Sequence, residues 1–312
     1  MALFRLLLHK YLILPLATTL MLMFIPLLIK VDYIIHILIQ IFMYCALAIS
    51  WDVFSGLTGY VNFALSGLFG AGGYAFAIFL KKTGMNPFLA LLFAVFFVGI
   101  VCLGIGSITL RLAGVYFVVT TFAITVLFES LVIAARDLTG GSTGISIMEW
   151  YILDKSIYYY HFLGVLLFTA LLSYHIRRSK FGLGLVAIRE NELAAQTFGV
   201  NVTLYKVMAF TISGLLIGYI GGLNAWYVCH LDPEKVFSVT LTTYTIASCV
   251  LGGIGTFAGP IIGASVLTLS TQLLVTIMPY LDLLVQGSLL VFLIAFAPRG
   301  VAGIVERYYK ER

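Results

Sequence analysis

Two acidic residues, Asp52 and Glu129, stand within long apolar stretches of the sequence. A carboxylate at membrane depth is costly, so by default it marks a group that binds a cation, moves a proton or pairs with another helix. A proton relay requires several such groups, and the sequence offers few, which argues against a proton-driven carrier. The histidines are scattered, with no pair at a spacing of four residues, so no metal site is expected.

The two acids have different expected surroundings. Asp52 is expected at a helix end in the membrane interface. Glu129 lies deeper in its apolar stretch, and Arg136 follows two turns later on roughly the same helix face. We therefore expect Glu129 to form a structural ion pair or an interhelical hydrogen bond. For both acids a functional role is the alternative.

Motifs for enzymatic chemistry are missing or misplaced. The sequence contains no G-x-x-x-x-G-K-[ST], so a nucleotide is not expected to bind through a P-loop. Residues 253–258 fit G-x-G-x-x-[GA], but no strand is predicted before them and no acidic residue follows about 20 positions later. Residues 140–144 fit G-x-S-x-G, but they lie in a predicted loop without a partner histidine. We expect no enzyme, no catalytic residue and no metal ligand.

The composition requires a membrane. Hydrophobic residues make up 62% of the chain and charged residues 10%, and the mean hydropathy is +1.09. No charged residue or histidine occurs in residues 53–80, 83–110 or 237–281, whereas about 20 apolar residues suffice to cross a bilayer as a helix. The sequence predicts an all-α polytopic membrane protein. Its four isolated cysteines are expected to be buried free thiols.

One transmembrane domain is predicted to occupy residues 1–312. The apolar run near the N-terminus is expected to remain as a first span, because it is longer than the core of a signal peptide. We expect about ten transmembrane helices, some of them broken by glycines, over residues 12–29, 33–51, 57–80, 88–110, 113–134, 158–176, 204–229, 239–255, 259–278 and 282–298.

Basic residues predict the orientation of these spans. Three clusters precede the first span, follow the sixth and follow the last: Arg5 and Lys10; Arg177, Arg178, Lys180 and Arg189; Arg299, Arg307, Lys310 and Arg312. Because Lys and Arg favour cytoplasmic loops, an even number of spans places all three clusters and both termini in the cytoplasm. The net charge of +5 is attributed to topology rather than to nucleic-acid binding. Lys81 and Lys82 are the exception, since the same topology places them outside.

Three glycine-rich regions, residues 55–74, 139–145 and 251–263, interrupt the predicted helices. The first and the third are apolar and lie in opposite halves of the chain. Paired interrupted segments of this kind suggest a duplicated transporter architecture with the transport pathway at the breaks. Within one predicted span, glycines at four-residue spacing are expected to pack inside the subunit, with a subunit interface as the alternative. These are Gly214, Gly218 and Gly222.

One polar segment, residues 179–201, lies between the sixth and the seventh predicted spans. Its run "LVAIRENELAAQTFG" favours a helix that Gly199 would end, and Asn201 or Thr203 could cap the next span. A helix resting in the membrane interface would carry a basic face and large apolar anchors. This segment is rich in Ala and mixed in charge, which favours docking into a groove of a protein partner. We expect three of its residues near one face: Ile188, Ala195 and Phe198.

At this segment the sequence resembles a known family. The run "SKFGLGLVAIRENELAAQTFGVNVTLYKVMAFTISG" is similar to the cytoplasmic loop of branched-chain amino acid ABC transporter permeases of the LivM type, within the LivH/LivM permease family. The family is also resembled, in the same order, by "FSGLTGYVNFALSGLFGAGGYAFA", "LRLAGVYFVVTTFAITVLFE", "LTGGSTGI", "LGGIGTFAGPIIGA" and "FAPRGVAGI". The resemblance covers residues 40–305 and departs from the usual Ser-Leu-Gly at residues 62–64, which are Asn-Phe-Ala.

The resemblance implies a transport complex in a bacterial or archaeal cytoplasmic (inner) membrane. Besides the lipid bilayer, the implied partners are a LivH-like second permease, two ABC ATPase subunits (LivG/LivF-like) and a periplasmic or extracellular substrate-binding protein. ATP and magnesium would bind to the ATPase subunits, so no cofactor is expected on this chain. Residues 179–201 would form the coupling helix that transmits ATPase motion to the spans. The expected coupling residues are Ala187, Arg189, Glu190, Asn191, Glu192, Ala194, Ala195 and Gly199.

The resemblance also implies the substrate, a branched-chain or related amino acid carried by alternating access. No Lys or Arg lies deep in a predicted span, so helix N-termini and backbone groups at the glycine breaks would have to bind the amino acid. The expected pathway residues are Thr58, Gly59, Asn62, Ser66, Glu129, Gly253 and Gly255. A urea or short-amide permease of the same family is the first alternative. An ion-coupled secondary carrier that works alone is the second.

Overall fold

A computed structural model describes residues 31–277, together with Phe24, Pro26 and Gly287. Except for those three residues, the predicted spans 12–29 and 282–298 lie outside the described residues. The basic residues near both ends of the chain also lie outside them.

Long apolar helices make up the membrane domain. Six helical segments are long and apolar enough to cross a bilayer: α2 (Asp32–Thr58), α4 (Pro87–Thr109), α5 (Val115–Ala134), α7 (Lys155–Arg178), α10 (Val202–Val228) and the segment Pro233–Gly252, which contains α11 (Pro233–Val236) and α12 (Val239–Gly252). Two more apolar helices, α3 (Leu65–Thr83) and α13 (Gly259–Ile277), pack among them. Every predicted span between residues 33 and 278 overlaps one of these helices. The protein is therefore an all-α, multi-pass membrane protein.

The first glycine-rich region contains a non-helical break at residues 59–64. The prediction ends one helix at residue 51 and starts the next at residue 57, whereas α2 continues to Thr58 and α3 begins at Leu65. The end of α2 is set by Gly59, which has a φ of 77° and donates its N–H to the Ser55 carbonyl at 3.0 Å. Glycine adopts this left-handed conformation without the steric cost of a side chain.

Helix α10 packs closely against α3 and α4. A Cβ on Gly72 of α3 would overlap the carbonyl oxygen of Gly218, and a Cβ on Gly214 would overlap the sulfur of Cys102. Small residues allow helices to approach this closely. The predicted packing of these glycines inside the subunit is confirmed, and so is the prediction of four buried free cysteines.

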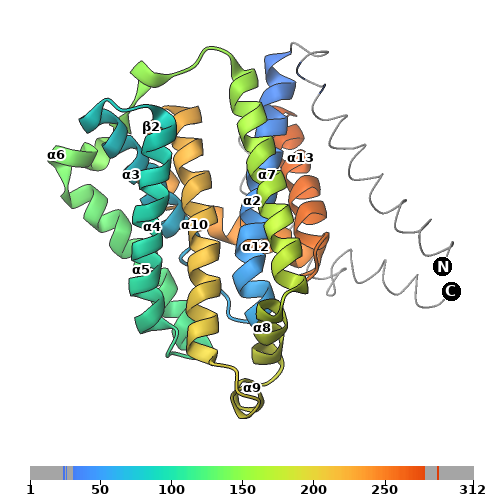
Figure 1. Ribbon diagram of the computed structural model, residues 1–312. Helices are drawn as coiled ribbons and strands as arrows, with labels where there is room; N and C mark the ends of the chain where they lie inside the picture. The colour runs from blue at the N-terminus through green and yellow to red at the C-terminus, as the bar shows by residue number, and fades with distance from the viewer. Residues whose placement is uncertain (1–23, 25, 27–30, 278–286, 288–312) are drawn as a thin grey trace.

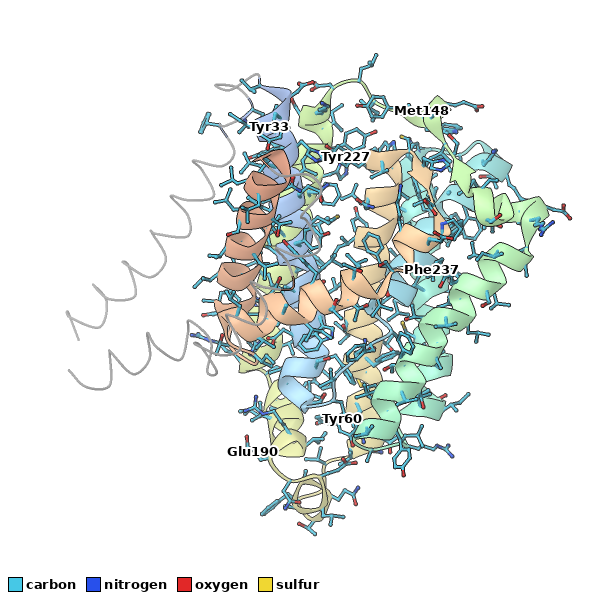
Figure 2. All side chains as sticks on the ribbon, turned by 180° about the vertical axis from the view of Figure 1, so that it is seen from behind. Tyr33, Tyr60, Met148, Glu190, Tyr227 and Phe237 are labelled. Carbon is cyan, nitrogen blue, oxygen red and sulfur yellow. The ribbon has the colours of Figure 1, made fainter. Side chains whose placement is uncertain are left out.

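The two ends of the bundle differ (Figure 1). At one end, the polar segment forms α8 (Lys180–Glu190) and α9 (Glu192–Thr197), and α9 is the tip at the bottom of Figure 1. We call this the α9 end. Figure 2 places Tyr60 and Glu190 at the same end, seen from behind.

The opposite end carries short elements and a two-stranded ladder, and we call it the β end. Strand β1 (Ile145–Ser146) pairs antiparallel with β2 (His230–Leu231). The short helices beside the ladder are α6 (Arg136–Thr139), η1 (Gly141–Thr143) and η2 (Met148–Trp150). Figure 2 shows Met148 at this end.

Candidate functional site

The break between α2 and α3 contains a buried amide with an unused donor. The Asn62 carbonyl accepts a hydrogen bond of 2.8 Å from Trp51 Nε1, and Asn62 Oδ1 accepts one of 2.8 Å from the N–H of Ala64. Among the described residues, Asn62 Nδ2 is the one buried side-chain nitrogen or oxygen without a hydrogen-bond partner. An unsatisfied buried donor costs about 1–3 kcal/mol, so a ligand that accepted this hydrogen bond would recover that cost. The nearby Thr58 hydroxyl instead donates to the Phe54 carbonyl of its own helix at 2.7 Å.

The first turns of α3 and α12 meet at two hydroxyl groups. Thr242 Oγ1 donates to Ser66 Oγ at 2.9 Å and accepts a hydrogen bond of 3.1 Å from the N–H of Ser66. Both side chains are buried. The partially positive N-terminal ends of two helices therefore lie together just after the first break.

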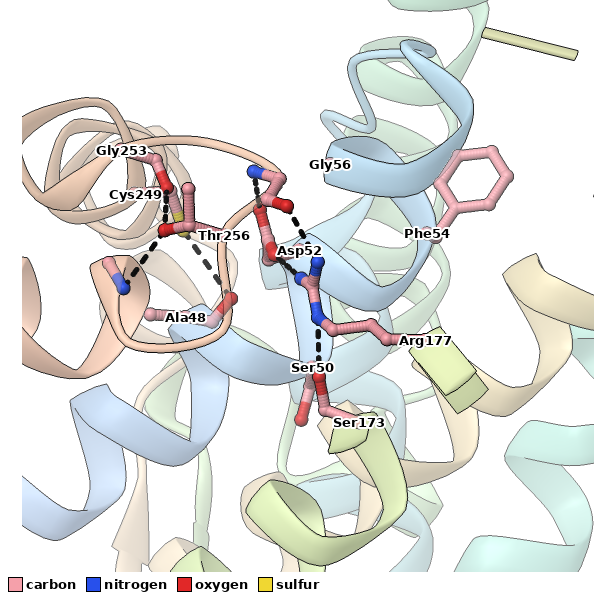
Figure 3. Close-up of polar contacts among 12 residues, drawn as sticks. Ala48, Ser50, Asp52, Phe54, Gly56, Ser173, Arg177, Cys249, Gly253 and Thr256 are labelled. Atoms are coloured by element: carbon pink, nitrogen blue, oxygen red, sulfur yellow. Dashed lines mark hydrogen bonds and ion pairs between the residues drawn. The ribbon is translucent and has the colours of Figure 1, made fainter. Parts of the chain in front are cut away.

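The second break, residues 253–258 between α12 and α13, is bound by an ion pair from two other helices (Figure 3). Gly253 ends α12 with a φ of 113°. Asp52 of α2 accepts the N–H of Gly255 at 2.8 Å and pairs with Arg177 of α7. Arg177 also donates to the Gly255 carbonyl at 2.6 Å.

The position of Asp52 differs from the prediction. Its side chain is buried inside α2 and lies against the second break, so the expectation of a helix-end carboxylate in the membrane interface is wrong. A buried carboxylate is tolerated where a cation and hydrogen bonds compensate for the lost water, and Arg177 and Gly255 provide both. Arg177 belongs to a predicted basic cluster, and the structure shows that it is also the ion-pair partner of Asp52.

Arg189, near the end of α8, contacts both breaks. Its Nη1 donates to the Gly56 carbonyl at 3.0 Å. A Cβ on Gly59 would lie 2.9 Å from Arg189 Cγ, and a Cβ on Gly255 would lie 2.7 Å from Arg189 Nη1. Glycine is needed at both positions because each also has a positive φ, 77° and 76°. The Arg189 side chain therefore lies against both glycine breaks and is hydrogen-bonded to the last turn of α2.

A second polar cluster holds the start of α9. Glu192 accepts hydrogen bonds of 2.6 Å from the Tyr60 hydroxyl and 2.8 Å from Lys206 Nζ. Lys206 is only 3% exposed, and its Nζ lies 4.5 Å from the centre of the Tyr60 ring. Partial burial raises the pKa of Glu192, but the hydrogen bonds from Lys206 and Tyr60 and the charge of Lys206 outweigh it, so the pKa lies below its ordinary value. The carboxylate thus ties α9 to α10 and to the first break.

The predicted single helix in this region is two helices. Asn191 has an extended conformation, with φ −161° and ψ 110°, and its Oδ1 accepts the N–H of Ala194 at 3.0 Å as the N-cap of α9. The cap starts a new helix in a different direction, which a run of good helix formers does not reveal. Gly199 follows the end of α9 with a φ of 84°, and Asn201 caps α10, as predicted.

The expected coupling residues differ in exposure. Ala195 is buried, at 2% exposed, and Glu192 and Ala194 are half-buried. The other five are exposed: Ala187, Arg189, Glu190, Asn191 and Gly199. The predicted common face is wrong for one member, because Ile188 and Ala195 are buried while Phe198 is 88% exposed. Helix α9 ends at Thr197, and Phe198 follows it as the C-cap residue, so Phe198 does not continue the buried face of Ala195.

Two further exposed apolar residues lie on the same segment, Leu183 and Leu193. Leu193 is 75% exposed on the short helix at the tip. The sequence does not mark them as surface residues, because apolar side chains are more often buried. Exposed apolar side chains at the end of a molecule indicate a contact surface.

A pocket of about 510 Å³ lies between the α8–α9 segment, the first break and the start of α5. It is lined by Thr58, Gly59, Tyr60, Val61, Gly114, Val115, Val118, Ile188, Arg189, Glu190, Asn191 and Glu192. Two of the seven expected pathway residues, Thr58 and Gly59, and four of the eight expected coupling residues therefore face one common space.

Glu129 does not form the predicted pair. Among the described residues no ion pair joins Glu129 to Arg136. Helix α5 ends at Ala134, and Ala135 turns the chain before Arg136 begins α6. The prediction assumed one continuous helix through Arg136, and this turn removes the two-turn spacing. Glu129 is half-buried on α5 and is not among the residues that line the pocket.

Comparison with known proteins identifies the family. Residues 33–294 match the family described as "Branched-chain amino acid transport system / permease component". The high-affinity branched-chain amino acid transport system permease protein LivM of Salmonella typhimurium is 27% identical, over 83% of this chain and 67% of the relative. The probable branched-chain amino acid transport permease protein LivH of Methanocaldococcus jannaschii is 25% identical, over 79% and 84%.

A third relative carries a different substrate name. The galactose/methyl galactoside import permease protein MglC of Escherichia coli is 29% identical, but over 38% of this chain and 37% of the relative. The family match includes both glycine breaks and the α8–α9 segment that contacts them. With most of its length matched in this way, the chain belongs to the branched-chain amino acid transport permease family and resembles its LivM members.

Proposed function

We propose that this chain is the transmembrane subunit of an ATP-binding cassette importer for branched-chain or related amino acids. The observation that carries the proposal is the position of Arg189. It lies on the segment that forms the tip of the molecule, and it contacts the backbone at both glycine breaks. A force applied to this segment from outside the membrane would be transmitted to the breaks directly.

The two ATPase subunits bind, in this proposal, to the α9 end. Leu183, Leu193 and Phe198 supply exposed apolar contacts there, and Ala187, Glu190, Asn191, Ala194 and Gly199 complete the surface. Arg189 and Glu192 transmit the motion, because their side chains are bonded to the chain's own helices and breaks. Ala195 supports the segment from inside. α9 lies at the tip beyond the long helices (Figure 1), which favours a protein partner over lipid.

In this proposal, alternating access uses the same contacts. ATP binding closes the ATPase dimer and moves α8–α9, and the breaks rearrange because Arg189 and the Asp52–Arg177 pair hold them to three helices. The α9 end then faces the cytoplasm. A LivH-like second permease completes the membrane part, and a periplasmic or extracellular binding protein delivers the substrate at the β end, across a bacterial or archaeal inner membrane.

The first break supplies the polar groups for the substrate. Asn62 offers a buried amide donor, and the N-terminal ends of α3 and α12 meet at Ser66 and Thr242. An amide and two helix N-termini suit a carboxylate without the full charge of a Lys or Arg. Such a site binds weakly, which fits an importer whose binding protein selects the substrate.

A neutral small solute is the second candidate. The Asn62 amide can donate equally well to the carbonyl oxygen of urea or of a short amide, and one partial relative is named for galactose. Uptake into proteoliposomes, measured with labelled leucine, urea and galactose side by side, distinguishes these substrates. We expect leucine uptake that requires ATP and the ATPase subunits. Uptake by the lone chain that stops when an ion gradient is dissipated would instead indicate a secondary carrier.

A further inference from the structure

A hollow of about 320 Å³ lies at the β end, opposite the α8–α9 segment. It is lined by Ile78, Lys81, Lys82, Arg136, Asp137, Leu138, Gly140, Gly144 and Ile145. Two lysines and an arginine thus share one small space with a single aspartate. The lysines come from the last turn of α3, and the arginine and the aspartate come from α6.

The three cations have no carboxylate partner in the part of the chain that the structure describes. The ion pairs there involve Lys155, Arg177, Arg189, Lys206 and Lys235. Lys81, Lys82 and Arg136 are exposed. Lysines in the last turn of a helix favour its dipole, but this effect does not explain why Arg136 of a separate element joins them.

The loop beneath the hollow has a defined shape. Thr139 Oγ1 donates to the Val132 carbonyl at 2.6 Å and accepts the N–H of Gly141 at 3.1 Å. Gly141 has a φ of 63°, and a Cβ there would lie 2.9 Å from Arg136 Cγ. The arginine therefore rests against a glycine whose backbone position is held by Thr139.

The placement of these charges also runs against membrane topology. If the α9 end faces the cytoplasm, Lys81, Lys82 and Arg136 lie on the outer side, where basic residues near span ends are disfavoured. Unpaired cations that gather there around a hollow need a reason other than orientation. Charge complementarity gives one, since an acidic side chain entering the hollow would meet positive charge from two elements.

We propose that this hollow is the docking site for an acidic side chain on the extracytoplasmic substrate-binding protein, an inference that rests on the proposed function. A partner protein is favoured over an anionic lipid headgroup because loop residues Gly140 and Gly144 and strand residue Ile145 form part of the hollow. The site therefore extends beyond the helix ends onto the loop surface. One carboxylate at the centre would reduce the positive charge excess of the cluster.

The test compares charge-reversal variants in the complete transporter, reconstituted in lipid nanodiscs with its binding protein. Lys81→Glu/Arg136→Glu is expected to weaken binding of that protein by roughly tenfold or more and to reduce its dependence on salt. Lys235→Glu is the matched control, because Lys235 is 84% exposed, lies on α11 shortly after β2 and does not line the hollow. It should change the affinity less than about twofold. Unchanged ATPase assembly confirms that the variants fold.

Two outcomes overturn the proposal. Wild-type affinity in the double variant would do so, and so would an equal loss in Lys235→Glu. Wild-type affinity together with reduced retention of anionic lipid would assign the hollow to lipid instead. The wild-type transporter tests the proposed function separately: if the binding protein does not stimulate its ATP hydrolysis, the importer assignment fails, and the docking site with it.

Discussion

Arg189 donates a hydrogen bond of 3.0 Å to the carbonyl oxygen of Gly56, near the C-terminal end of α2. The donor belongs to a short helix at the tip of the molecule, and the acceptor belongs to the last turn of a buried span. The same guanidinium group lies within contact of Gly255 in the second break. One side chain thus connects the exposed segment to two breaks that are almost 200 residues apart in sequence.

The glycines beneath Arg189 provide a first prediction. Gly59→Ala or Gly255→Ala is expected to lower stability by about 1–2 kcal/mol, because an alanine must adopt a positive φ, and to impair transport further by displacing Arg189. Gly84→Ala is the control, because its φ is 62° but no atom lies within 4 Å of the added carbon. Thermal unfolding and ATP-driven uptake measure the two effects. If Gly84→Ala loses as much transport as Gly59→Ala, steric displacement of Arg189 is not the cause.

The buried ion pair predicts a second result. Asp52→Asn leaves Arg177 without its carboxylate, and removal of one partner of a buried pair costs about 3–5 kcal/mol. Asp52→Asn/Arg177→Met removes both charges, so part of that loss should be recovered. Thermal unfolding in detergent compares the single and the double variant. A double variant less stable than the single one would show that the pair itself is not the source of the effect.

The Glu192 cluster predicts a dependence on pH. The folded-state pKa of Glu192 lies below its ordinary value of 4.5, so its contribution to stability is present above that value and is lost as the pH falls through the folded-state pKa. Wild-type protein should therefore be more stable than Glu192→Gln at about pH 7, and the difference should shrink as the pH falls below 4.5. Thermal unfolding across this range tests it, with Glu190→Gln, whose side chain is 71% exposed, as the control. A stability difference that grows on acidification contradicts the assignment.

Substitutions of exposed apolar residues at the α9 end are expected to prevent ATPase binding. Leu193→Asp and Phe198→Asp should abolish association with the ATPase subunits while membrane insertion and thermal stability stay normal, because both side chains are exposed. Ala195→Arg should behave differently and destabilise the segment, because Ala195 is buried. Co-purification and thermal unfolding separate the two classes. Normal co-purification of both aspartate variants would move the partner surface elsewhere.

Much of the fold could be predicted because lipid imposes simple rules on sequence. Runs without charge identified the helices between residues 33 and 278, since each span must be apolar over its length. The exact break positions could not be predicted in the same way. Gly56 and Gly59 are both available after the second span, and the choice between them depends on tertiary contacts such as the one from Arg189. Likewise, α5 ends in a turn at Ala135, which separates Glu129 from Arg136. No glycine or proline at that position signals the turn in the sequence.

The sequence predicted which residues belong to the candidate site better than it predicted which of them contact one another. Gly59, Gly255 and Arg189 were all expected to be functional, but nothing in their sequence spacing places them together. Asp52 and Arg177 are 125 residues apart and meet through the packing of α2 against α7. Lys206 and Tyr60 were missed because each is an isolated polar residue at the edge of an apolar run. Only the fold brings them to Glu192.

The amount of ATP hydrolysed per leucine transported in Arg189→Gln tests the central claim most directly. In proteoliposomes that contain the complete transporter, we predict ATPase binding and hydrolysis near the wild-type rate with transport reduced by roughly tenfold or more, because the segment still meets its partner but no longer moves the breaks. Leucine transport at the wild-type ratio to ATP would contradict the claim that Arg189 couples the α8–α9 segment to the glycine breaks.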